Sequence, residues 1–287
     1  MALEGLTGEK ISVGPPFFNM TFGPLMIPLL IALPIGPMLA WKRGDFAGAM
    51  QRLAFAFGLA IVALVAVFAA EYRGPWLAPF GIALGVYVMA GAAIEWANRV
   101  KVGSASVDEI VRRAKNLPRS AYGTLLAHFG IGMLVVGIVA TSAYREEHIQ
   151  AMKPGEKLAV NGYDITFTGI DRARGPNYVE DIADFDVKRD GSTVAQLTPS
   201  KRLYDAPPQS TTESGIYAAW RGDLYLVIGD PQPGGGYAVR AYFNPLVRFI
   251  WLGALIMFIG GGISLSDRRL RVGAPAKARQ SIAVPAE

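Results

Sequence analysis

Long apolar runs dominate the hydrophobic pattern of this chain. Five windows lack Asp, Glu, Lys and Arg over the roughly 18–20 residues that a helix needs to cross a bilayer, at residues 11–41, 53–70, 74–94, 120–144 and 249–266. They predict transmembrane helices at about 18–41, 53–71, 76–95, 120–143 and 245–266, with Glu95 reaching the membrane surface at a helix end. Four prolines in the first predicted helix, at about 18–41, indicate a packed bundle, because neighbouring protein must satisfy the freed carbonyls.

Basic residues alternate along the connections between these windows. The first and third connections and the tail carry three, six and five of them, whereas the short second connection holds only Arg73. Because basic loops stay in the cytoplasm, we predict residues 1–17 and 144–244 outside and residues 267–287 inside. Lys115 and Arg269 are accordingly expected inside and Tyr204 outside. The start carries no basic region followed by an apolar core, so we expect no signal peptide, and rather a fragment or one piece of a split protein.

Residues 144–244 change to an alternating pattern that is typical of strands. In "FDVKRDGSTVAQL" the pair Asp190-Gly191 separates two alternating runs, which indicates a two-residue hairpin turn. About six short strands without a helical period predict a small antiparallel sandwich or partly open barrel. The predicted fold is a polytopic α-helical membrane protein of about five transmembrane helices, with this extracytoplasmic β domain inserted before the last helix.

Charge and cysteine content exclude several classes of function. The net charge is +5, yet residues 144–244 hold 11 Lys+Arg against 14 Asp+Glu, so the basic excess lies in the connections and the tail. It therefore reflects membrane topology, and we expect no nucleic-acid partner. The absence of cysteine excludes a disulfide, a thiolate metal site or a redox pair within this chain.

The two histidines of the chain occupy different settings. His148 follows two glutamates, and we expect it at the solvated outer end of the fourth span. His128 lies within that span, where an ionisable side chain indicates a functional site. Gly123, Gly130 and Gly137 recur every seven residues and form a face for close helix packing, with His128 on roughly the opposite face. A neutral imidazole there can ligate a metal, most commonly haem iron, or hydrogen-bond to a neighbouring helix, and the pattern leaves both open.

Several segments occur in an order that resembles a known family. They are "GEKISVGPPFFN", "AHFGIGMLVVGI", "GPNY", "KRLY", "TTESGI", "RGDLYLVIGD", "YAVRAYFNPLVRFIWLGALIMFIGG" and "DRRLR". Together they resemble the C-terminal part of the CcmF/NrfE-type cytochrome c maturation proteins, the haem lyase subunit of bacterial System I. The stretch 237–261 is the most specific part of the resemblance.

The resemblance implies a haem-lyase subunit of the bacterial inner membrane. It would bind haem b and support thioether attachment to the CxxCH motifs of apocytochrome c, as part of an enzyme complex. His128 matches the histidine of the family's "AHxG" segment and would be an axial ligand of haem iron. The implied partners are an N-terminal CcmF half with a tryptophan-rich haem-handling motif, a CcmH-type apocytochrome-binding subunit, the CcmE haem chaperone, apocytochrome c and the lipid bilayer.

Two departures from the family pattern limit this interpretation. The chain has no Trp-Trp pair, and the other histidines of the family lie upstream of anything present, so the chain alone cannot form the complete haem site. The alternatives are a non-catalytic haem-transfer or assembly scaffold and a small-molecule permease subunit. Lys201, Arg202 and Arg240 are further candidates, as cations for haem propionates or for an acidic docking surface, although such residues are more often solvated strand-edge charges.

Overall fold

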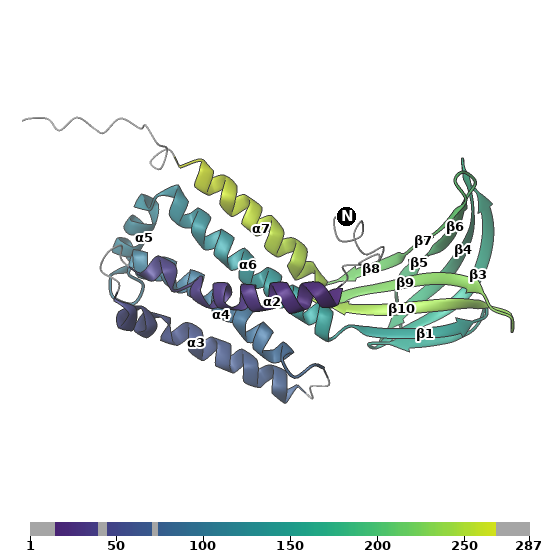
Figure 1. The fold of residues 1–287 in the computed structure, drawn as a ribbon, viewed down its shortest axis with the longest axis horizontal. Helices are drawn as coiled ribbons and strands as arrows, with labels where there is room; N and C mark the ends of the chain where they lie inside the picture. Colours follow the sequence, from purple (N-terminus) through teal and green to yellow (C-terminus); the bar gives the residue numbers. More distant parts are fainter. Residues whose placement is uncertain (1–14, 40–44, 71–73, 268–287) are drawn as a thin grey trace, which may run out of the picture. The chain divides into compact units, whose positions relative to one another are not determined.

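The helices of the chain match the predicted membrane architecture. The computed structural model describes residues 15–39, 45–70 and 74–267. Its helices are α2 (Pro15–Ala32), the 3-10 helix η1 (Gly36–Met38), α3 (Phe46–Ala69), α4 (Ala78–Val100), α5 (Val107–Asn116), α6 (Arg119–Ala143) and α7 (Val247–Leu265) (Figure 1). Within these described ranges, five segments are long and apolar enough to cross a membrane: Met20–Met38, Phe46–Ala69, Ala78–Val100, Arg119–Ala143 and Val247–Leu265. The prediction of five spans is confirmed.

The described residues form two compact units. One comprises residues 1–56, 88–130 and 255–287, and the other comprises residues 57–87 and 131–254. Helices α3, α4, α6 and α7 pass through both units, whereas every strand of the described part belongs to the second. The predictions for residues 1–14, for Arg73 and for the tail from Arg268 onward lie outside the described residues.

The helix bounds differ from the predicted ones where charged residues lie near a helix end. Helix α3 begins at Phe46 and includes Arg52, whose guanidinium donates to the Met38 carbonyl oxygen at 3.4 Å. Helix α4 continues past Glu95 to Val100, because Glu95 pairs with Arg99 one turn later. The ten-residue helix α5 between α4 and α6 was not predicted, since its sequence is too polar to stand out among the apolar windows.

Glycines bring α6 and α7 into close contact. A Cβ atom on Gly123 would lie 2.6 Å from the Gly260 carbonyl oxygen, within the first unit. A Cβ atom on Gly137 would lie 2.7 Å from the Ile250 nitrogen, within the second unit. Two of the three positions of the predicted glycine face therefore carry backbone-to-backbone packing against α7, as small residues do in membrane bundles.

Replacing Gly123 by alanine should destabilise the helix bundle. The added methyl group would meet backbone atoms that cannot turn aside, and overpacking of this kind costs about 1–3 kcal/mol. The matched control is Gly58→Ala in α3, where a Cβ atom meets nothing within 4 Å. Thermal unfolding in detergent should show a lower midpoint temperature for Gly123→Ala than for the unsubstituted chain. The midpoint temperature of Gly58→Ala should be unchanged. Equal midpoints for the two variants would contradict the packing.

Ten strands of the described residues form two antiparallel sheets in the second unit. One sheet has the order β1 (Glu146–Met152), β10 (Tyr237–Pro245), β9 (Gly222–Pro231) and β8 (Gly215–Ala219). The other has the order β2 (Lys157–Val160), β3 (Tyr163–Arg174), β4 (Tyr178–Arg189), β6 (Ser200–Tyr204) and β7 (Gln209–Glu213), with β5 (Ser192–Leu197) also paired to β4. The antiparallel β domain is confirmed, but it has ten strands rather than the six expected, because several strands are only four to six residues long.

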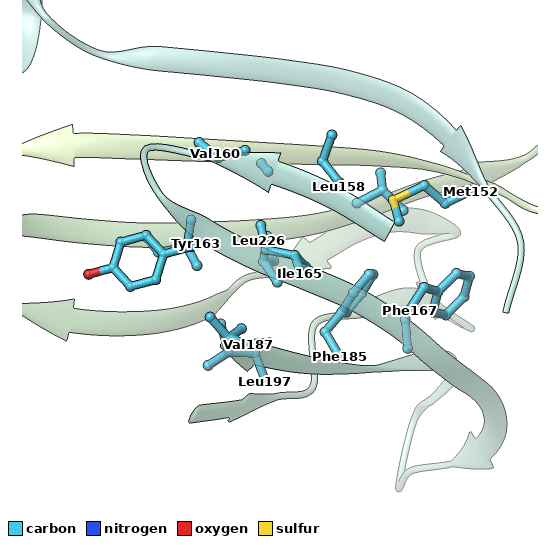
Figure 2. Close-up of a cluster of buried hydrophobic side chains, with 14 of the residues drawn as sticks. Met152, Leu158, Val160, Tyr163, Ile165, Phe167, Phe185, Val187, Leu197 and Leu226 are labelled. Carbon is cyan, nitrogen blue, oxygen red and sulfur yellow. The ribbon is translucent and has the colours of Figure 1, made fainter. Parts of the chain in front are cut away.

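The predicted hairpin and alternation are both present. Strands β4 and β5 pair with Arg189 opposite Ser192, and the two residues between them have positive φ, 49° at Asp190 and 78° at Gly191. Two positive φ values match the turn type that the right-handed twist of hairpin strands favours. The inward side chains of both sheets form one core, which includes Ile165, Phe167, Phe185 and Leu226 (Figure 2).

Candidate functional site

His128 lies on the face of α6 that packs against α4. In the second unit, a Cβ atom on Gly85 of α4 would lie 2.8 Å from the Gly132 carbonyl oxygen and 2.6 Å from a Val136 methyl carbon. These two residues of α6 therefore face α4. His128 precedes Gly132 by four residues and so shares its helix face. The imidazole consequently points away from the Gly123 and Gly137 contacts with α7.

His128 is partly shielded from solvent and has one carboxylate near it. The side chain is half-buried, and Val88 and Ala92 of α4 are buried in the same unit. The Glu95 carboxylate lies within electrostatic range of the imidazole. Across residues 15–39, 45–70 and 74–267 the ring makes no hydrogen bond, so the alternative of a histidine tied to a neighbouring helix finds no support there.

Glu95 is buried in the protein and precedes the end of α4 by more than one turn, so it is not the exposed helix-end residue that was expected. Its exposed fraction is only 6%. The carboxylate can remain inside because Arg99, one turn later on α4, forms an ion pair with it. The four-residue spacing of Glu95 and Arg99 was visible in the sequence and is the signal that could have identified this pair.

His128 fits a haem ligand as a single imidazole. No group of three His, Cys, Asp or Glu side chains that could hold a metal ion occurs among the described residues. The half-buried ring in an apolar helix pair, free of hydrogen bonds within that part of the chain, can direct one nitrogen lone pair to iron. If haem binds there, His128 would supply one ligand, and a second ligand would come from another segment.

His148 lies on a strand, so the prediction that it extends the fourth transmembrane helix is wrong. Helix α6 ends at Ala143, and β1 begins at Glu146. His148 pairs with Ala241 of β10, and its side chain is exposed. The chain leaves the helix early because β1 gains main-chain pairing with a strand that is distant in the sequence.

The three candidate cations do not form one cluster. Lys201 and Arg202 are neighbours on β6, whereas Arg240 lies on β10 of the other sheet. Lys201 forms an ion pair with Asp230. Arg202 pairs with Glu180 at 2.9 Å and with Glu213 at 3.3 Å. Arg240 is exposed on the outer face of its sheet. Two of the three charges are thus engaged within the domain.

Arg202 and Ser200 together stabilise the charged form of Glu180. The Arg202 Nε and the Ser200 hydroxyl both donate to Oε2 of Glu180, at 2.9 Å and 2.8 Å. These hydrogen bonds, the one from Arg202 first, hold the pKa of Glu180 below its usual value. The same bond raises the pKa of Arg202, whose guanidinium also lies 4.7 Å from the Tyr178 ring centroid.

The β domain should lose stability in acid partly through Glu180. Because the folded-state pKa is lowered, the contribution of this carboxylate is fully present above the ordinary value of about 4.5 and is lost as the pH falls through the folded value. Urea unfolding midpoints between pH 7 and pH 3 should therefore fall less steeply in Glu180→Gln than in the unsubstituted chain. Arg202→Gln should flatten the same part of the curve, and an unchanged slope in both variants would refute the coupling.

Comparisons with known proteins agree with this architecture. Residues 143–245 match the family model described as the CcmF C-terminal beta-sandwich. The chain is 50% identical over 284 residues to the cytochrome c-type biogenesis protein CycK of Rhizobium meliloti, covering 99% of this chain and 42% of that protein. It is 35% identical to the cytochrome c-type biogenesis protein CcmF of Pseudomonas aeruginosa, covering 98% of this chain and 42% of that protein.

One solved structure supports the fold alone. A chain entitled "Cytochrome c Heme Lyase CcmF" superposes with a TM-score of 0.70 at 22% identity, covering 92% of this chain and 42% of that chain. This chain thus spans about two-fifths of the length of the relatives that it matches.

Proposed function

Because this chain belongs to the CcmF family, we propose that it acts in bacterial cytochrome c maturation as part of a haem lyase, with His128 as an axial ligand of haem iron. The observation that carries the proposal is the half-buried imidazole inside a membrane-spanning helix, without a hydrogen bond in the described part of the chain. An ionisable group in such a position is energetically costly, and in membrane proteins it marks a candidate functional site.

The residues around His128 bind and orient rather than react. The close packing at Gly85 and Gly132 holds α6 against α4 within the second unit. The buried, Arg99-paired Glu95 places a fixed negative charge within electrostatic range of the ring. Haem, when bound, supplies the vinyl groups to which the thiols of an apocytochrome CxxCH motif add to form thioethers. Those thiols come from the substrate, since this chain has no cysteine.

The complete activity requires segments beyond this chain. We propose that the second axial ligand and the tryptophan-rich haem-handling motif come from an upstream CcmF part. The further partners are the CcmE chaperone, a CcmH-type subunit and apocytochrome c. The β-sandwich is proposed to dock one of these proteins on the extracytoplasmic side. The proposal that an upstream part shares the activity agrees with the match of this chain to only 42% of the relatives' length.

We propose that the chain resides in the bacterial inner membrane with its β domain in the periplasm and residues 101–118 in the cytoplasm. The absence of native cysteine allows single cysteines to report topology. Tyr204→Cys should react with an impermeant maleimide added to the periplasmic side, and Lys115→Cys should react only after the membrane is opened. Labelling of positions 204 and 115 from the same side of the membrane would exclude this orientation.

The decisive experiment combines a haem spectrum with an attachment assay. The chain is co-produced with an upstream CcmF part, purified, and supplied with haem-loaded chaperone and apocytochrome c. A haem spectrum together with covalent attachment is expected. A haem spectrum without any contribution to attachment would instead identify a haem-transfer or assembly scaffold, and the absence of haem would favour a protein of another class, such as a permease subunit.

A further inference from the structure

Helix α5 is held at the level where the bundle meets the membrane surface. It connects α4 with α6, two helices that can cross a bilayer, so the bilayer surface is adjacent to it. The Tyr122 hydroxyl in the first turn of α6 donates to the Ala114 carbonyl oxygen of α5 at 2.8 Å. The Tyr122 ring lies 6.4 Å from that of Trp96 in the last turns of α4. Tyrosine and tryptophan gather at membrane interfaces, so this pair marks the interface beside α5.

One side of α5 exposes apolar side chains that no described residue covers. Val107 and Val111 lie one turn apart on the same helix face, with exposed fractions of 74% and 44%. Ile110 and Ala114 are half-buried, and they continue this apolar arc toward the rest of the first unit. Asn116 lies on the opposite side of the helix from Val107 and is also exposed. The helix is therefore amphipathic, with part of its apolar face open.

The charge around α5 is positive and only partly compensated. Residues 101–119 contain five Lys and Arg against two acidic residues. Glu109 pairs with both Arg112 and Arg113. Lys101, Lys115 and Arg119 form no ion pair with any residue in the described part of the chain, and all three are exposed. Three cations on or next to α5 thus lack a partner in the described part of the chain.

We propose that α5 is an interfacial anchor that binds the headgroups of anionic phospholipids, a role separate from the haem site. Val107 and Val111 insert at the boundary between headgroups and acyl chains, as the apolar face of a surface helix does. Lys101, Lys115 and Arg119 contact the lipid phosphates, whose negative charge complements the uncompensated cations. The bilayer is favoured as the occupant over a protein because helices that can cross it flank α5 on both sides. The free charge is also predominantly basic, with three cations against the one carboxylate of Asp108.

The proposal is tested with the whole chain in lipid nanodiscs. A polarity-sensitive fluorophore is attached through Val107→Cys or, as the matched control on the opposite face, through Asn116→Cys. In discs containing phosphatidylglycerol, the label at position 107 should emit at shorter wavelength and be quenched several-fold more by acyl-chain-brominated lipid than the label at position 116. The difference should shrink in purely zwitterionic discs, at high salt, and in the triple variant Lys101→Gln, Lys115→Gln, Arg119→Gln.

A second measurement does not depend on the label. Phosphatidylglycerol that remains bound to the detergent-purified chain should decrease in the triple variant, whose circular dichroism spectrum should be unchanged. Equal quenching at positions 107 and 116, or the same response in zwitterionic and anionic discs, would overturn the proposal. A label at position 107 that is shielded from both water and brominated lipid once an upstream CcmF part is present would also overturn it, and would assign the face to a protein contact.

Discussion

Alanine in place of His128 should abolish covalent haem attachment to apocytochrome c when the chain is produced with an upstream CcmF part. The substitution removes the one imidazole that the described membrane helices place within the bundle, and His148 is exposed on β1, where it cannot replace the lost ligand. Insertion should be normal, because alanine is well tolerated in a helix. His128→Cys should retain part of the activity, since thiolate is also a haem ligand.

The measurement is haem staining of c-type cytochrome in a strain that lacks the native subunit, together with the absorbance spectrum of the purified complex. His148→Ala is the matched control, and it should support normal attachment. Immunoblotting establishes that each variant is present in the membrane in equal amount. Normal attachment with His128→Ala would mean that the histidine is only a packed polar residue of α6.

Truncating Phe167 to alanine should strongly destabilise the β-sandwich. Phe167 is 0% exposed, and its ring stacks on that of Phe185 at a centroid distance of 4.9 Å (Figure 2). Removing a buried phenylalanine costs about 3–5 kcal/mol, because both transfer energy and packing contacts are lost. That is a large share of the roughly 5–15 kcal/mol by which a domain is stable.

A buried thiol can report this loss without interference from the helices. Val187 is fully buried in the same core, and Val187→Cys in the cysteine-free chain becomes reactive only when the domain opens. The urea concentration at which half of the thiol at position 187 is labelled should fall sharply when Val187→Cys is combined with Phe167→Ala. Leu203→Ala, at a position 55% exposed on β6, should leave it nearly unchanged. The same midpoint for both variants would disprove the role of Phe167 in the core.

Strong local patterns were sufficient for much of the fold. The apolar windows identified five membrane helices because crossing a bilayer requires a long uncharged run, which few other structures need. Asp190-Gly191 identified the β4–β5 hairpin because its turn requires positive φ at both residues. The seven-residue recurrence of glycine identified the face of α6 that approaches α7. In each case the constraint acts on residues that are close together in the sequence, so a short stretch of the chain is enough to recognise it.

Features that depend on distant partners could be established only from the tertiary structure. The strand position of His148 results from pairing between β1 and β10, and the extra short strands are likewise stabilised by their neighbours rather than by their own length. The burial of Glu95, and the pairing of Lys201 with Asp230 and of Arg202 with Glu180, depend on where opposite charges come to lie. A charged side chain can be buried or engaged only when a partner is placed beside it, and that placement is a property of the folded chain.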